Sequence, residues 1–336
     1  RWGNFGGISA AWTVSKEAFL SGNRIINDLK LRAGYGSVGN DGSAAYYAWQ
    51  SLYVMNQNAN LGALYLSQVG ATNLIWEKVG TWGAAVEGRL FDKLNFSAEY
   101  FDKRSIDLIF PFNLPLSAGA TTSLVAEATV LKNLGTLSNK GWELAADYDI
   151  ISGKEFRLNF GANATFLKNK IIRLPEENRK GGIISGSKKL FEGHSIYDFW
   201  LYQFAGVDQM TGTSLYIADD VVYNGGNPDK PGTAIPASSL VTVNGKKYVK
   251  NTTYAKRDWS GTSIPKVFGG VTLKADWENL TFSALFTYSL GGKMLDYTYQ
   301  DLMAMSGPAH NLHVDLLQSW NGAPAGMTET SPNRLD

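Results

Sequence analysis

The sequence contains no cysteine, and its 336 residues include no uninterrupted apolar run of about 18 residues. The first absence excludes disulfide bonds, thiolate metal sites and a cysteine nucleophile. The second argues against a transmembrane helix, which needs about 20 consecutive apolar residues. Charged residues are also scarce at 18%, against roughly 25% in soluble domains. Because the net charge is only +1, no broad positive field exists for phosphate backbones, and a nucleic-acid partner is not expected.

Glycine (36 residues) and aromatic side chains (12%) are plentiful, and many segments alternate apolar with polar residues. The clearest is FRLNFGANATF at residues 156–166, whose period of two predicts a β-strand with one apolar face. Its length exceeds the five or six residues typical of soluble strands and suits a tilted crossing of a membrane. Seven further segments show the pattern, the first of them weakly: residues 3–14, 28–36, 83–91, 94–102, 142–150, 266–277 and 280–290.

Short and long connections alternate between these segments. Tight hairpin turns are predicted at residues 92–93, 152–154 and 278–279, and Ser15 is placed to cap a short helical turn. Short turns at one end and long loops at the other are typical of outer-membrane barrels, whose long loops lie outside the cell. The long connections cover residues 38–75, 105–136, 169–264 and 291–336.

In such a barrel the apolar row of each strand faces lipid and the polar row faces a water-filled lumen. The predicted lumen-facing residues are Arg157, Asn159 and Asn163, with Lys274 and Asp276 on a later strand. A soluble β-sandwich that binds carbohydrate produces the same alternation and stays open as an alternative. A self-contained eight-stranded barrel acting as an adhesin is a third possibility, which requires the first and last strands to pair.

Three motifs resemble sites for nucleotide binding, metal binding or nucleophilic catalysis, but the residues that such sites also require are missing around them. GYGSVG at residues 34–39 fits a dinucleotide-binding fingerprint, yet no helical pattern follows, so these glycines are expected to end a barrel strand. His310 and His313 have a spacing that suits two metal ligands, but no third ligand accompanies them. Residues 194–198 bring His, Ser and Asp together without a nucleophile elbow. No catalytic residue, metal or cofactor is therefore predicted.

The stretch EGHSIYDFWLYQFAGVDQMTG at residues 192–212 is rich in aromatic side chains. Flat aromatic faces bind sugar rings and also anchor protein interfaces, whereas a loop core is the alternative for any one of them. We expect four of these residues to contact a substrate or a partner: Tyr197, Phe199, Trp200 and Tyr202.

Several other stretches occur together over nearly the whole chain: GNFGGISAAWTVSKEAFL, LKLRAGYGSVGN, LIWEK, NLGTLSNKGWELAADY, IPKVFGGVTLKADWENLTFSALFTYSLGGK and APAGMTET. In these stretches, and in residues 192–212, the sequence resembles the carboxy-terminal barrel region of SusC-type TonB-dependent outer-membrane transporters. The resemblance implies an all-β fold: an antiparallel transmembrane barrel segment of about eight strands, from a 22-stranded barrel in the outer membrane of a Gram-negative bacterium. Residues 1–336 would form one partial barrel domain, with the plug domain, the TonB-box segment and the closing strands absent.

The resemblance also implies a function, which is non-enzymatic import of glycan oligosaccharides or peptides, energised by the TonB complex. The implied partners are a SusD-type surface lipoprotein seated over the extracellular loops, the TonB complex and outer-membrane lipid. Many relatives carry an acidic calcium loop near the position of residues 211–227, and the departure of this sequence from that pattern argues against calcium binding there.

Overall fold

The computed structural model describes two compact units, within residues 3–20, 22–44, 46–58, 60–113, 129–133, 135–219, 234–304 and 311–336. Unit 1 comprises Arg1–Arg179, Phe191–Ile196 and Pro265–Gly291; unit 2 comprises Lys180–Leu190, Tyr197–Ile264 and Gly292–Asp336. His310, considered above as a metal ligand, and residues 220–227 of the calcium-loop region lie outside the described residues. No described helix is long and apolar enough to span a membrane.

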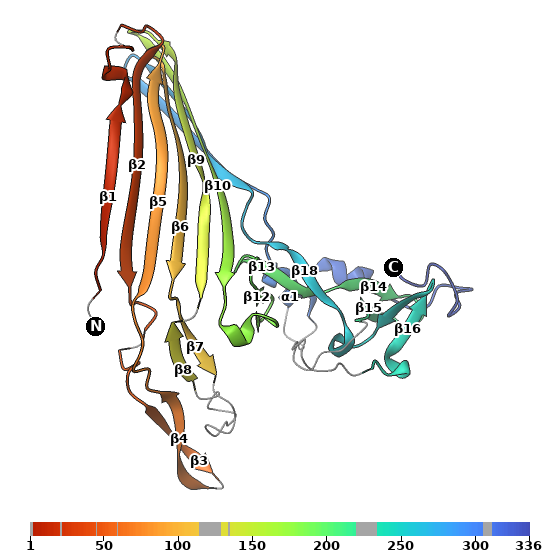
Figure 1. Cartoon of the computed structure of the whole chain (residues 1–336). Coiled ribbons are helices and arrows are strands. Elements are labelled where there is room, and N and C mark those ends of the chain that lie inside the picture. Colours follow the sequence, from red (N-terminus) through yellow and green to blue (C-terminus); the bar gives the residue numbers. More distant parts are fainter. Residues whose placement is uncertain are drawn as a thin grey trace. The chain divides into compact units, whose positions relative to one another are not determined.

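Unit 1 is built on one antiparallel sheet of eight strands, drawn side by side in Figure 1. All eight predicted strands are present, and they pair in chain order, so the predicted all-β antiparallel fold is confirmed. A sandwich would divide them between two facing sheets, which is not what these strands do. Among the described residues the two outer strands do not pair with each other, so no closed eight-stranded barrel is formed. The strands are β1 (Gly6–Thr13), β2 (Ile26–Asn40), β5 (Glu77–Leu90), β6 (Leu94–Ile106), β9 (Thr136–Ser152), β10 (Phe156–Arg173), β19 (Val267–Trp277) and β20 (Leu280–Leu290).

The three predicted tight turns join β5 to β6, β9 to β10 and β19 to β20. Asp92 and Glu278 adopt the left-handed backbone (φ 58° and 48°) that such turns require. The predicted cap at Ser15 is wrong. The 3-10 helix η1 (Val14–Lys16) has no side-chain cap, because Ser15 lies inside it and its hydroxyl instead donates to Asp28 Oδ1 at the start of β2 (2.8 Å).

The strands that enter the long loops are longer than predicted, with 17 residues in β9 and 18 in β10. The prediction for β10 stops at Phe166, where the outward row changes from apolar to charged with Lys168 and Lys170. The backbone ladder continues regardless, and Lys168 pairs with Lys140 of β9. The alternation therefore ended before the strand did.

The first two long connections carry a second sheet of unit 1, beyond the loop ends of the barrel strands (Figure 1). Asn133 joins this sheet to the barrel strands: its Oδ1 accepts from the Ile75 N–H, and its Nδ2 donates to the Ile75 and Asp107 carbonyls (2.8 Å each). Glu77 of β5 likewise accepts from the Ile109 N–H (2.8 Å). The strands are β3 (Leu52–Asn58), β4 (Leu61–Val69), β8 (Thr129–Asn133) and β7 (Ile109–Asn113), with β4 and β8 parallel.

Unit 2 consists of short strands in two sheets, with a small core of Leu215, Val241 and Val243 against Tyr248 and Leu335. The first sheet contains β11 (Ile183–Ser185), β12 (Lys188–Leu190), β13 (Asp198–Tyr202) and β18 (Arg257–Thr262). The second contains β14 (Phe204–Asp208), β15 (Thr213–Ile217), β17 (Lys246–Val249) and β16 (Leu240–Val243). Its helices are α1 (Tyr297–Met303) and the 3-10 turns η5 (Ala237–Ser239), η6 (Thr252–Tyr254) and η7 (Val314–Gln318); a further turn, η3 (Glu176–Asn178), belongs to unit 1.

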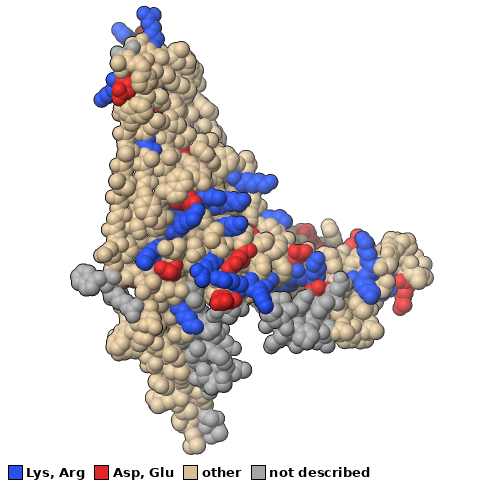
Figure 2. Space-filling view, viewed as in Figure 1, with Lys and Arg blue, Asp and Glu red and all other residues tan. Residues whose placement is uncertain are grey.

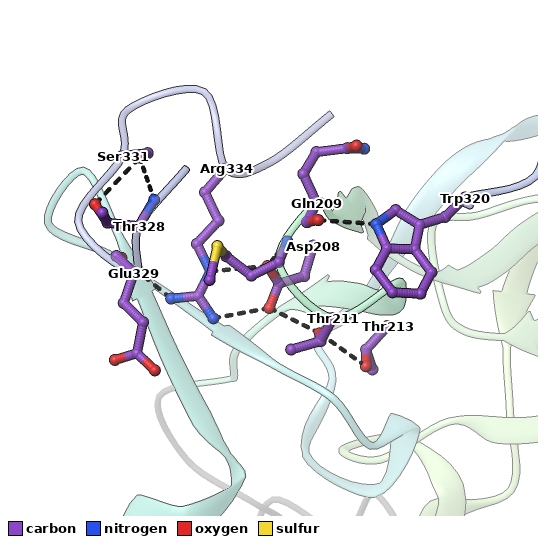
Figure 3. Close-up of polar contacts among 10 residues, drawn as sticks. Asp208, Gln209, Thr211, Thr213, Trp320, Thr328, Glu329, Ser331 and Arg334 are labelled. Atoms are coloured by element: carbon purple, nitrogen blue, oxygen red, sulfur yellow. Dashed lines mark hydrogen bonds and ion pairs between the residues drawn. The ribbon is translucent and has the colours of Figure 1, made fainter. Parts of the chain in front are cut away.

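A buried ion pair fastens the last residues of the chain to β14 (Figure 3). The Arg334 guanidinium donates to both carboxylate oxygens of Asp208 at 2.8 Å, and Asp208 is fully buried. The Met210 N–H and the Thr211 hydroxyl donate to the same carboxylate, each at 3.0 Å. These donors hold the pKa of Asp208 below its ordinary value, with Arg334 the largest cause.

Candidate functional site

Cross-strand register places the predicted polar residues on one face of the eight-stranded sheet. Arg157 lies opposite Asp276, and Asn159 lies opposite Lys274. Asn163 lies on the same row of β10, where its Oδ1 accepts from the Gly270 N–H (3.0 Å). The same face continues across the other strands with Asp28, Lys30, Arg32, Glu87, Arg89, Asn95, Glu99, Glu143, Asp147 and Asp149. We call this surface the polar face.

The opposite face of the sheet is apolar over the same length. On β10 it carries Phe156, Leu158, Phe160 and Ala162, one step out of phase with the polar residues. Phe160 is 40% exposed although it lies mid-strand, so nothing in the described chain covers it. Further members of this apolar face are Trp12, Leu31, Val86, Ala98, Leu144, Leu273 and Phe286.

Aromatic side chains mark the loop end of the apolar face. The ring of Tyr100 lies 5.2 Å from that of Trp82 and 5.2 Å from that of Trp142, and Trp142 pairs with Phe166 of β10. We call Trp82, Tyr100, Trp142 and Phe166 the aromatic band. From Phe156 to Phe166 the strand rises about 33 Å, which spans about 25 Å of membrane at a tilt of about 40°. The apolar face therefore has the height of an outer-membrane barrel's lipid-facing belt.

The polar face contains an ion-pair network around Arg32. Its guanidinium contacts Glu87 at 2.5 Å and Glu99 at 2.6 Å, which links three neighbouring strands. Beside it lies a shallow depression of about 410 Å³, floored in part by Gly34 and Gly83. Residues 34–39, which match the dinucleotide fingerprint, thus belong to β2, and the described residues that follow them form no helix that could hold a pyrophosphate. Gly34, the first glycine of this motif, lines the depression on the polar face.

The aromatic stretch of residues 192–212 places its rings in unit 2, where β13 pairs with β18. Trp200 lies opposite Trp259, with ring centroids 5.0 Å apart. Lys189 Nζ lies 4.4 Å from the Trp200 ring, and the Arg257 guanidinium lies 4.1 Å from the Tyr202 ring. We call these five residues the aromatic–cation face. Rings stacked with cations offer both flat apolar surface and hydrogen-bond donors, a combination suited to polar oligomers.

The four predicted contact residues differ in what they offer. Tyr197 and Tyr202 are 43% and 38% exposed, and Trp200 is half-buried. Phe199 is only 6% exposed and packs beneath Lys188, whose Nζ lies 4.6 Å from its ring. Phe199 therefore offers little surface to a ligand.

Sequence reasoning missed the three partners Lys189, Arg257 and Trp259. Burial against its surroundings lowers the pKa of Lys189. These residues lie on short strands without regular alternation, and two of them are distant in sequence from β13. The only signal available was a tryptophan next to charged residues within a long loop.

The groups that hinted at catalysis have structural roles. The Ser195 hydroxyl donates to Asn169 Oδ1 (2.7 Å) and is buried. His313 precedes η7, and its Nδ1 accepts from the Asp315 N–H (3.2 Å). Within the described ranges, no group of three or more His, Asp or Glu side chains is placed to hold a metal ion.

One long-stranded sheet with an apolar belt, a polar opposite face, short turns at one end and long loops at the other defines an outer-membrane β-barrel wall. Comparison with known families agrees: residues 4–307 match the model of the TonB dependent receptor-like β-barrel. The chain belongs to this family of outer-membrane receptors. The soluble sandwich alternative is therefore excluded.

Similar proteins support the assignment. TonB-dependent receptor P3 of Formosa agariphila is 26% identical over 93% of this chain, and TonB-dependent receptor SusC of Bacteroides thetaiotaomicron is 26% identical over 90%. The RagAB peptide transporter structure shares the fold, with a TM-score of 0.71 and 20% identity over 94% of this chain. The chain spans only 30%, 29% and 32%, respectively, of the lengths of these proteins.

Proposed function

We propose that this chain is part of the wall of a TonB-dependent importer, which moves polar oligomers across the outer membrane. The observation that carries the proposal is the polar face, which runs along the eight-stranded sheet directly behind a lipid-height apolar face. In this proposal Arg157, Asn159 and Asn163 line the aqueous path together with Lys274 and Asp276. The role is non-catalytic, because the wall needs only to hydrate and guide its cargo.

Two classes of cargo fit the aromatic–cation face: glycan oligosaccharides and peptides. Sugar rings stack on Trp200 and Tyr202, and peptide carboxylates pair with Lys189 and Arg257. RagAB, which shares the fold, is a peptide transporter. Tyr197, Trp200 and Tyr202 then contact either the cargo or a SusD-type surface lipoprotein, whereas the buried Phe199 offers little surface to either.

The remaining parts of the machine are proposed to lie outside these residues. The sheet has two unpaired edges among the described strands, which lipid does not tolerate, so a wider barrel must complete it. In this proposal the eight strands are one portion of a 22-stranded barrel around a plug domain. Contact with the TonB complex belongs to that plug region.

The proposal is tested on the full-length transporter in its outer membrane. Trp200→Ala and Tyr202→Ala are expected to weaken binding of the cargo or of the lipoprotein by about 1–3 kcal/mol each, as interface aromatics do. The matched control is Tyr297→Ala, an exposed tyrosine on α1 that is not part of the aromatic–cation face. Binding is measured by calorimetry with fluorescent glycan and peptide pools, and with purified lipoprotein.

Unchanged affinity for all three ligands in correctly folded variants would leave Trp200 and Tyr202 with a structural role only. Import itself is checked separately by uptake of the same labelled pools with and without an intact TonB complex. TonB-independent uptake would contradict the proposed mechanism.

A further inference from the structure

Just beyond the aromatic band, the outward row of the sheet changes abruptly from apolar to basic. Lys140 of β9 and Lys168 of β10 each lie two residues beyond a band member, Trp142 and Phe166 respectively. Lys170 follows on the same row of β10. Two residues correspond to about 7 Å of strand, which is the step from the acyl chains to the headgroup layer. In Figure 2 Lys and Arg lie at both ends of the long strands, and the larger group lies toward the loop ends.

The arrangement of these lysines is electrostatically unfavourable unless an anion lies between them. Lys168 lies directly opposite Lys140 in the register, and like charges in that position repel. The acidic residue next in this row is Asp102, which lies opposite Lys140 on β6. Its carboxylate is already engaged by the Arg104 guanidinium (3.1 Å), and it accepts from the Ser138 hydroxyl (3.3 Å).

Within the described part of the chain, no acidic side chain forms an ion pair with Lys140, Lys168 or Lys170. All three are exposed at the surface. Lysine side chains at such a depth extend along the surface toward the headgroup layer. A basic row that is unpaired, self-repelling and held at one depth is complementary to an anionic lipid headgroup.

We propose that Lys140, Lys168 and Lys170 bind the phosphates of a phosphorylated glycolipid of the outer leaflet, of the lipid A type. The acyl chains of this lipid pack on the apolar face below the band, against Leu144 and Ala164, while its phosphates lie between the lysines. The site is distinct from the polar face and from the aromatic–cation face, and it requires no cargo. Its role is to anchor this side of the barrel in the outer leaflet.

The test uses the full-length transporter purified in detergent, with Lys140→Gln/Lys168→Gln as the variant. Lys93→Gln/Lys154→Gln at the tight turns is the matched control, because it removes the same charge at the other end of the strands. Binding of lipid A is measured by native mass spectrometry. Each basic residue near an anionic surface contributes about fivefold, so the variant, which lacks two of them, is expected to bind lipid A about 25-fold more weakly. The control is expected to match the wild type.

Thermal unfolding supplies a second readout that guards against misfolding. Without lipid the variant is expected to unfold at the wild-type temperature or above it, because the repulsion between Lys140 and Lys168 is removed. Lipid A is expected to raise the unfolding temperature of the wild type and of the control only. Equal stabilisation of the variant, or equal stabilisation of the wild type by inorganic phosphate or by lipid A lacking its phosphates, would overturn the proposal. Cargo uptake is measured independently, because loss of lipid A binding would test this site alone and loss of TonB-dependent uptake would test the proposed import function alone.

Discussion

Phe160 and Asn159 are adjacent in the chain, yet the sheet gives them opposite environments. Phe160 lies near the middle of the apolar face, and Asn159 Nδ2 donates to Asp149 Oδ1 (3.0 Å) on the polar face. Phe160→Arg is expected to destabilise the full-length barrel by about 2–4 kcal/mol, because an arginine near the bilayer midplane must leave water. Asn159→Arg should cost far less, since Asp149 is placed to pair with it. Unfolding in urea from lipid vesicles measures both, and equal costs would contradict the assignment of the faces.

Asp208 and Arg334 form the second residue-scale feature with a measurable consequence. Breaking a buried pair leaves one charge uncompensated, so Asp208→Asn should loosen the C-terminal attachment by about 3–5 kcal/mol. The bond also responds to acid. Because Arg334 holds the native pKa of Asp208 below its ordinary value of 3.8, the contribution is full above that value. It is lost as the pH falls through the native pKa.

Hydrogen exchange, corrected for intrinsic rates, reports this prediction directly. Protection of residues 207–213 and 334–336 is expected to be high at pH 7 and to fall below pH 4 in the wild type. In Asp208→Asn the same residues should already be open at pH 7, with no acid step. An acid step that survives in the variant would assign the titration to another group.

At the scale of elements, Asn169 of β10 fastens the loop Phe191–Ile196 to the end of the sheet. Its Nδ2 donates to Asn139 Oδ1 (2.7 Å), and its Oδ1 accepts from the Ser195 hydroxyl (2.7 Å) and the Ile196 N–H (3.0 Å). Asn169→Ala leaves these partners unsatisfied, at a cost of about 1–3 kcal/mol. We expect faster hydrogen exchange in residues 191–196 and unchanged exchange in the tight turns. Asn159→Ala, on the same strand but away from this loop, is the control.

The elements also explain what the sequence could predict. Alternation identified all eight long strands, because lipid forces their outward row to be apolar while the polar row faces away from it. It failed beyond the aromatic band, where Lys168 and Lys170 face outward although β10 continues to Arg173. Backbone hydrogen bonding continues there, but the outward row no longer faces lipid, so its residues need not be apolar and the alternation ends.

The candidate site was likewise predictable only where it lies on regular strands. Residues on regular strands, such as Arg157 and Lys274, could be placed on a common face from parity alone. The contacts that shape unit 2 could not, because they join residues far apart in sequence without a local pattern. Arg334 meets Asp208 across 126 residues, and Arg257 reaches Tyr202 from another strand. Such contacts depend on tertiary folding, and no periodic pattern in the sequence indicates them.

At the scale of the whole molecule, the eight-stranded sheet has two edges, β1 and β20, that pair with one neighbour each among the described strands. Closing the sheet on itself would need a different stagger and curvature from those of a wide barrel. The isolated 336-residue segment is therefore expected not to form a heat-resistant monomeric barrel in detergent. Electrophoretic mobility before and after boiling checks this, with the full-length transporter as the folded reference. A stable, heat-modifiable monomer would contradict the wider-barrel proposal.

The central claim is that one face of this sheet meets lipid and the other meets water. The 336 residues contain no cysteine, so single cysteines placed at each position of residues 156–166 can be labelled selectively wherever the rest of the transporter is also cysteine-free. In the full-length protein in lipid vesicles, a water-soluble maleimide should label the positions of Arg157, Asn159 and Asn163, while a lipid-soluble quencher should reach those of Leu158, Phe160 and Ala162. Labelling that shows no period of two along β10 would contradict the account.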